Sequence, residues 1–237
     1  MTHPGKRMFE AFYDSIWQHP LLLWILPVVF LFRLPRPRGF FLWALWIFTV
    51  LTILDPAMTG PLASLSWFSN STTQNIMLFF VLLGDFRFFF FVEHFGGSGA
   101  PDAKPGSRRA TLRALLWTLV VPLLQFGLIK TFANAFENPR HTFLAYELLF
   151  LVLASGFRFV LLPKRTIPDE NRVWLSAMTG YAMLYYALWA SADVLILSGL
   201  DLGFGLRVLP NLLYYGGFLP FIYWTAPASL KTNSQAP

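Results

Sequence analysis

Four ionisable residues in otherwise apolar stretches could carry chemistry: Asp85, Arg87, Glu147 and Arg158. A charge near the centre of a bilayer costs at least about 2.5–3.5 kcal/mol on insertion scales, so it persists where it pairs, binds an ion or serves a function. Carboxylate and guanidinium groups at that depth can bind a proton, an ion or a polar solute. We therefore predict an intramembrane polar cluster of these four residues. The alternative is a set of interhelical ion pairs that only fixes packing.

The spacing of these residues limits how they can meet. Arg87 follows Asp85 by two positions, about 200° around a helix, so the two cannot pair along one face. Glu147 and Arg158 are close to three helical turns apart and share a stripe. Arg158 also lies near a span end and can extend to the interface. Asp85 has a short side chain and lies about 15 Å inside its span, so depth makes it the strongest functional candidate.

A second group of residues could line a pocket: Asp193, Asn211, Tyr214 and Tyr215. Buried phenols need hydrogen-bond partners, and the two glycines that follow Tyr215 allow close helix approach. Packing without a pocket explains the same residues equally simply.

Signatures of enzymes are scarce in the chain. It has no cysteine, which excludes disulfides, thiolate metal sites and iron–sulfur ligation. Its four histidines lie at or outside the expected interfaces, and neither an HExxH motif nor a GxSxG elbow occurs. We predict no metal site and no cofactor. Acid–base catalysis by an Asp and an Arg at depth stays open, but the sequence favours a non-enzymatic role.

The composition indicates which elements must position these residues. Hydrophobic residues make up 56% of the chain and charged residues 13%, with a mean hydropathy of +0.54. A soluble domain carries roughly 25% charged residues. Stretches of about 17 to 25 apolar residues can cross a bilayer as helices. We predict an all-α membrane protein with seven spans at about 20–34, 39–55, 75–94, 111–131, 142–163, 172–198 and 205–226.

The predicted spans form one transmembrane domain over residues 20–226. Apolar side chains recur at helical spacing within residues 1–19, which predicts an interfacial amphipathic segment; a disordered tail is the alternative. Residues 227–237 are expected to form a disordered cytoplasmic tail.

The distribution of lysine and arginine predicts the orientation. Eleven cations follow the first, third and fifth spans or lie in the tail, and five lie on the opposite side. The positive-inside rule then places the N-terminus outside and the C-terminus in the cytoplasm. Because these cations flank helix ends, the formal charge of +6 indicates topology and not a nucleic-acid partner.

An internal repeat would divide the spans as three, one and three. His19 and His141 open the two outer triplets, and Leu34-Pro35-Arg36 and Leu162-Pro163-Lys164 end their first spans. Such an arrangement resembles, in span count, the SWEET and PQ-loop sugar transporters and the microbial rhodopsins. The chain contains no PQ dipeptide, and its last span has no lysine for a retinal Schiff base.

These features favour a small carrier or channel-like protein that handles an ion or polar solute through the predicted cluster. One alternative is a non-catalytic membrane subunit or sensor that assembles with partners, and another is a lipid-modifying enzyme. The expected partners are membrane lipids, with other membrane subunits or a homo-oligomer as further candidates. The expected location is a bacterial cytoplasmic membrane.

Overall fold

The regular structure of the chain is helical throughout the part that a computed structural model describes, residues 7–59, 70–97 and 106–231. The first half comprises α1 (Met8–Tyr13), a segment kinked at His19 (Trp17–Leu22), α2 (Leu23–Arg33), α3 (Phe40–Thr59), α4 (Asn70–Phe95) and α5 (Arg108–Thr131). The second half comprises a 3₁₀ turn (Ala133–Phe136), α6 (Pro139–Gly156) with a π-helical segment (Phe157–Leu161) and a 3₁₀ turn (Leu162–Lys164), α7 (Asp169–Leu197), α8 (Leu202–Asn211), a π-helical segment (Leu212–Gly217), α9 (Phe218–Thr225) and α10 (Ala228–Lys231).

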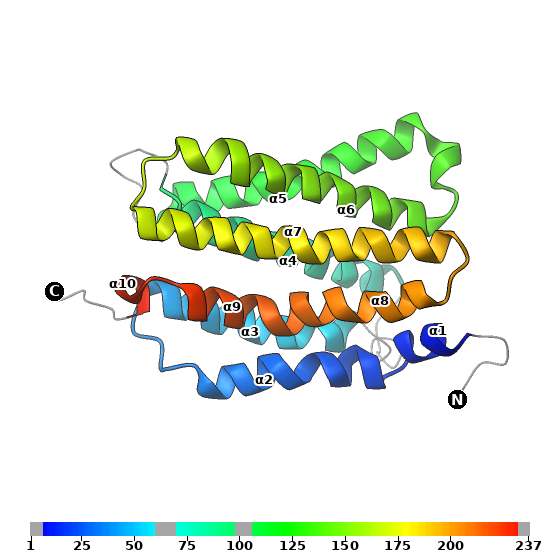
Figure 1. Ribbon diagram of the computed structural model, residues 1–237, viewed down its shortest axis with the longest axis horizontal. Helices are drawn as coiled ribbons and strands as arrows, with labels where there is room; N and C mark the ends of the chain where they lie inside the picture. The colour runs from blue at the N-terminus through cyan, green and yellow to red at the C-terminus, as the bar shows by residue number, and fades with distance from the viewer. Residues whose placement is uncertain (1–6, 60–69, 98–105, 232–237) are drawn as a thin grey trace.

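The long helices lie side by side along one axis (Figure 1), and successive helices run in opposite directions. Helices α8 and α9 and the π-helical segment between them form one continuous rod that packs along α7. Helix α1 lies at one end of the bundle and α10 at the other. Side chains in the middle of the bundle can therefore come from helices far apart in the sequence.

Among the described residues, four helical stretches are long and apolar enough to cross a membrane: α3, α5, Pro139–Lys164 and α7. They contain four of the predicted spans, so the chain has the features of a multi-pass helical membrane protein. The predicted spans 20–34, 75–94 and 205–226 also fall on helical segments, but Trp17–Arg33 is shorter than these four and α4 carries buried charges.

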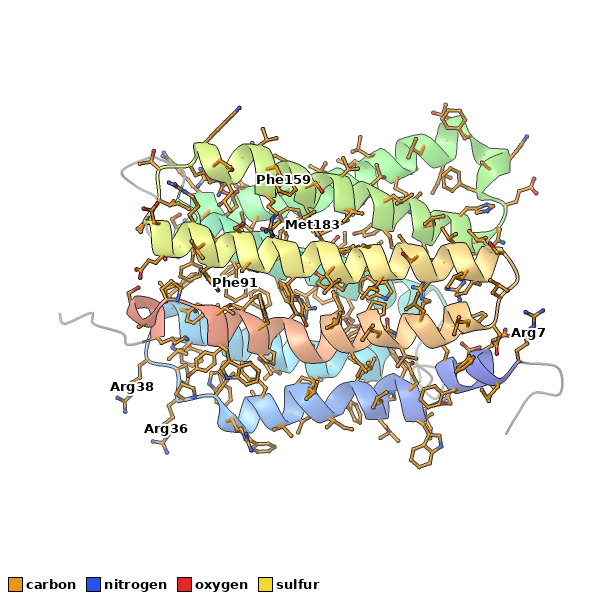
Figure 2. All side chains as sticks on the ribbon, in the orientation of Figure 1. Arg7, Arg36, Arg38, Phe91, Phe159 and Met183 are labelled. Atoms are coloured by element: carbon orange, nitrogen blue, oxygen red, sulfur yellow. The ribbon has the colours of Figure 1, made fainter. Side chains whose placement is uncertain are left out.

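Aromatic rings fill the interior of the bundle. Phe88, Phe89 and Phe91 of α4 are fully buried against residues such as Phe150 and Trp174. Figure 2 shows Phe91 between the helices and Phe159 near the rim, where its side chain is 66% exposed. Large apolar side chains on the outer surface are what a helix bundle presents to lipid.

The first predicted segment is helical only in part. Helix α1 packs on α8, and the Asp201 carboxylate accepts hydrogen bonds from the backbone N–H groups of Phe9 (3.0 Å) and Glu10 (3.1 Å). Met8 and Phe12 stay exposed, as an interfacial helix requires. Residues 1–6 lie outside the described residues.

The expected disordered tail begins with structure. Residues 228–231 form α10, and Lys231 Nζ donates to the Trp224 carbonyl at 3.0 Å. This contact satisfies a carbonyl near the end of α9, which explains why the chain stays ordered there. Residues 232–237 lie outside the described residues.

Basic side chains gather at the end of the bundle that carries α10. Figure 2 shows Arg36 and Arg38 at this end and Arg7 at the other. The alternating helices bring Arg108, Arg165 and their neighbours to the first end as well. Lys6 and Lys104, which the orientation count includes, lie outside the described residues.

Candidate functional site

Asp85 of α4 is 2% exposed and is held by two phenols from other helices. Tyr146 of α6 and Tyr186 of α7 each donate a hydrogen bond to one of its carboxylate oxygens. The Tyr186 ring stacks on Phe150 with centroids 4.0 Å apart, which fixes the direction of its hydroxyl. Asp85 is thus bonded by neutral donors, and no salt bridge to it occurs among the described residues.

Arg87 of α4 is 3% exposed and turns toward the opposite side of the bundle. It donates to Thr52 Oγ1 of α3 and to the backbone carbonyl of Tyr214, both at 2.7 Å. Its guanidinium carbon lies 4.1 Å from the ring centroid of Tyr214 and 5.0 Å from that of Phe218. The Tyr214 carbonyl belongs to a π-helical segment, a local widening that is frequent at functional sites.

A small pocket lies beside Arg87 between α3, α4 and the π-helical segment. Asp55 and Thr52 of α3 line it, and so does Tyr214. The space inside the pocket that the centre of a water molecule can occupy is about 10 Å³. The pocket can therefore hold about one water molecule. Arg87 Nε is buried without a hydrogen-bond partner. The remaining lining residues are Phe48, Leu51, Phe80, Leu83 and Gly84.

Gly84 lets the Tyr214 phenol lie against α4. A Cβ atom at this position would lie 1.5 Å from Tyr214 Oη and 2.7 Å from Tyr214 Cζ. Any larger residue would therefore push the ring away from Arg87. The absence of a side chain at Gly84 shapes the pocket.

A second polar group lies nearer the α1 end of the bundle. Arg207 of α8 binds Asp193 of α7, and its Nη1 lies 3.4 Å from Glu147 Oε1. Arg140 Nη1 contacts the same Asp193 oxygen at 3.2 Å, and Arg207 Nε donates to Tyr13 Oη at 3.2 Å. Two acids and two arginines balance in charge here. This group ties α1, α6, α7 and α8 together.

The structure does not bring the four predicted cluster residues into one group. Asp85 and Arg87 face different helices, as the 200° offset requires. Glu147 joins Arg207, whereas Arg158 donates to the Ser176 carbonyl beside Gly180. Eleven positions of α-helix span about 16 Å, so residues 147 and 158 lie at different depths despite sharing a stripe.

The four predicted pocket residues are also divided. Tyr214 lines the pocket, and the Tyr215 ring meets His19 edge-on with centroids 5.9 Å apart. Asn211 Oδ1 accepts from Trp189 Nε1 at 2.8 Å, and Asp193 belongs to the Arg207 group.

Sequence reasoning missed several residues of the site. Thr52 and Asp55 lie three positions apart on one face of α3. Two polar residues on the same side of an otherwise apolar span could have indicated this part of the site. Tyr146 carried no signal, and Tyr186 gave only the general one of a phenol that needs a hydrogen-bond partner when buried; the shared contact of the two with Asp85 was not predicted. Glu93, near the end of the predicted span 75–94, was not predicted as part of any site and is 2% exposed.

Glu93 is buried because two arginines reach it at the basic end. Arg165 donates to Glu93 Oε1, and Arg113 Nε lies 3.0 Å from Oε2. Next to it His94 contacts Thr111 Oγ1 at 3.1 Å and accepts from the Gly106 N–H at 2.9 Å. These bonds connect α4, α5 and the end of α6 and close that end of the bundle.

Comparisons with known proteins add no relative: the chain matches no protein-family model, no curated protein and no solved structure. Among the described residues no three His, Asp or Glu side chains come together as metal ligands would. The site itself offers carboxylates, a guanidinium and phenols. These groups can bind and pass protons or hold a small cation.

Proposed function

We propose that this protein is a small membrane carrier or channel-like protein that moves a proton or a small cation, with Asp85 as its binding group. The observation that carries the proposal is the environment of Asp85. A carboxylate buried in an apolar bundle and bonded only by phenols lacks a compensating positive contact. Such a group is stable when it holds a proton or a cation.

The proposal includes seven spans with a cytoplasmic C-terminus. The three segments beyond the four long apolar helices run alongside them in the bundle (Figure 1). Placing the basic end in the cytoplasm agrees with the positive-inside rule. We propose further that the exposed apolar side chains face the lipids of a bacterial cytoplasmic membrane.

The test is transport by the purified protein in vesicles of phosphatidylethanolamine and phosphatidylglycerol. A pH-sensitive dye inside the vesicles reports proton entry under a potassium-diffusion potential. Sodium or potassium gradients without that potential test the small cations. We expect a flux above that of empty vesicles for one of these ions, and the absence of flux for all of them would overturn the proposal.

A second candidate function is supported by the filled core. On the basic side of Arg87, the fully buried rings of Phe88, Phe89 and Phe91 occupy the interior. A membrane subunit or sensor needs such packing and no pathway. For this candidate we expect no flux, and we expect Asp85→Asn to change thermal stability alone.

A further inference from the structure

The central site contains more acid than base. Asp55 lines the same pocket as Arg87, Asp85 lies two positions before Arg87 on α4, and all three are at most 7% exposed. Two ionised carboxylates and one guanidinium would leave a net negative charge in an apolar interior. Burial of an uncompensated charge is costly, and a proton taken up by one carboxylate removes that cost.

Arg87 is not committed to either carboxylate. Among the described residues its hydrogen bonds go to the neutral oxygens of Thr52 and Tyr214, and its Nε has no partner there. Within the described residues it forms no salt bridge. A guanidinium held by neutral groups can compensate the charge of either acid through space, without a direct ion pair.

The pocket supplies the connection between Arg87 and Asp55. Both residues line it, together with the hydroxyl of Thr52 and the phenol of Tyr214. A buried water needs two to four polar partners, and these four groups meet that requirement. The Asp55 carboxylate also accepts hydrogen bonds from Thr59 Oγ1 at 3.0 Å and from the Tyr215 phenol.

We propose that Asp55 and Asp85 form one proton-binding centre that shares Arg87 as a single countercharge, with a water in the pocket bridging Asp55 and Arg87. The centre holds one proton. When Asp85 carries it, Asp55 is ionised and Arg87 compensates Asp55. When the proton moves to Asp55, Arg87 compensates Asp85. This inference rests on the proposed function and narrows its substrate to the proton.

The groups around the two carboxylates do not supply a second countercharge. The ionisable side chains that interact with Asp85 are Tyr146 from α6, Tyr185 and Tyr186 from α7 and Tyr214 from the π-helical segment, besides Arg87 from its own helix. Those that face Asp55 are Tyr214 and Tyr215 from the π-helical segment and again Arg87. Phenols are neutral at physiological pH, so Arg87 is the shared cation.

Infrared spectroscopy of the purified protein in lipid nanodiscs tests the shared proton directly, through difference spectra between the wild type and each variant. A protonated carboxylic acid gives a C=O stretching band that an ionised one lacks, and Asp→Asn removes it. If the proton is shared, either Asp55→Asn or Asp85→Asn leaves the other carboxylate paired with Arg87 and ionised. At neutral pH we therefore expect each substitution alone to remove the one carboxylic-acid band of the wild type. We expect Arg87→Gln to add a second carboxylic-acid band.

Controls separate the possible results. Asp169→Asn changes a 91% exposed carboxylate and should leave the difference spectrum flat, and Asp55→Glu and Asp85→Glu should shift the band without removing it. The glutamate variants give the answer even where an asparagine variant fails to fold. A band that disappears in only one asparagine variant, or in neither, would overturn the shared centre. This measurement needs no transport, so a shared proton without flux would reject the proposed function alone.

Discussion

Asp85 and Arg87 lie two positions apart in α4, and their side chains bond to different helices. Asp85 receives hydrogen bonds from α6 and α7, whereas Arg87 donates to α3 and to the π-helical segment after α8. Helix α4 thus connects both sides of the bundle through two buried charges.

The fit between Gly84 and Tyr214 gives the first prediction. Gly84→Ala places a methyl group where the Tyr214 phenol lies, and overpacking of this kind costs about 1–3 kcal/mol. We expect a lower thermal melting temperature in detergent. The matched control is Gly127→Ala in α5, where nothing lies within 4 Å of the added methyl group. That variant should melt at or above the wild-type temperature, since alanine favours helix. Equal losses in both would contradict the fit.

The ion pairs at the basic end give the second prediction. Glu93→Gln removes the charge that Arg113 and Arg165 share. A hydrogen bond to a charged group contributes about 1.5–3 kcal/mol, so the variant should unfold several degrees earlier. Asp169→Asn, at an exposed i, i+3 pair with Arg172, should cost almost nothing. A Glu93→Gln protein as stable as Asp169→Asn would show that Glu93 does not hold this end together.

The docking of α1 depends on Asp201. Asp201→Ala removes the acceptor for the first N–H groups of α1, a capping loss of about 1 kcal/mol. We expect faster hydrogen exchange confined to residues 8–13, followed by mass spectrometry. Ser198→Ala in the same turn should not change it, because the Ser198 hydroxyl bonds only within α7. Unchanged exchange after Asp201→Ala would mean that packing alone holds α1.

The orientation can be tested with single cysteines, because the chain has none of its own. Asn134 and Thr166 are exposed at opposite ends of the bundle. We expect Asn134→Cys to react with a membrane-impermeant maleimide on intact cells. Thr166→Cys should react only after the cells are opened. The reverse pattern would place the basic end outside.

The helices were predictable from the sequence because hydrophobic length alone determines where a chain can cross a bilayer. The range 172–198, for example, agrees closely with α7. The extension of α3 to Thr59 was not predictable, since Asp55 and Pro56 resemble an end signal. In the structure the pocket and Thr59 accommodate Asp55, so the helix continues. The three-one-three repeat stays a prediction.

From the sequence, the site was predictable only as a set of ionisable residues within apolar stretches. Depth correctly identified Asp85 and Arg87 as buried. Their partners depend on how helices are arranged around α4, and a single sequence does not contain that arrangement. Tyr146 and Tyr186 are 40 positions apart and meet only at Asp85. Glu147 was predicted to join Asp85, Arg87 and Arg158, whereas in the structure it lies next to Arg207. Arg207 is on a different helix, and spacing along one helix does not predict contacts with another.

The most direct measurement of the central claim compares Asp85→Asn with the wild type in the vesicle flux assay and in a thermal melt. Asparagine keeps the shape of the side chain and removes its ability to bind a proton. The claim that Asp85 carries the transported ion predicts a folded protein with a melting temperature near the wild-type value and no flux. A folded Asp85→Asn protein with full flux would contradict it.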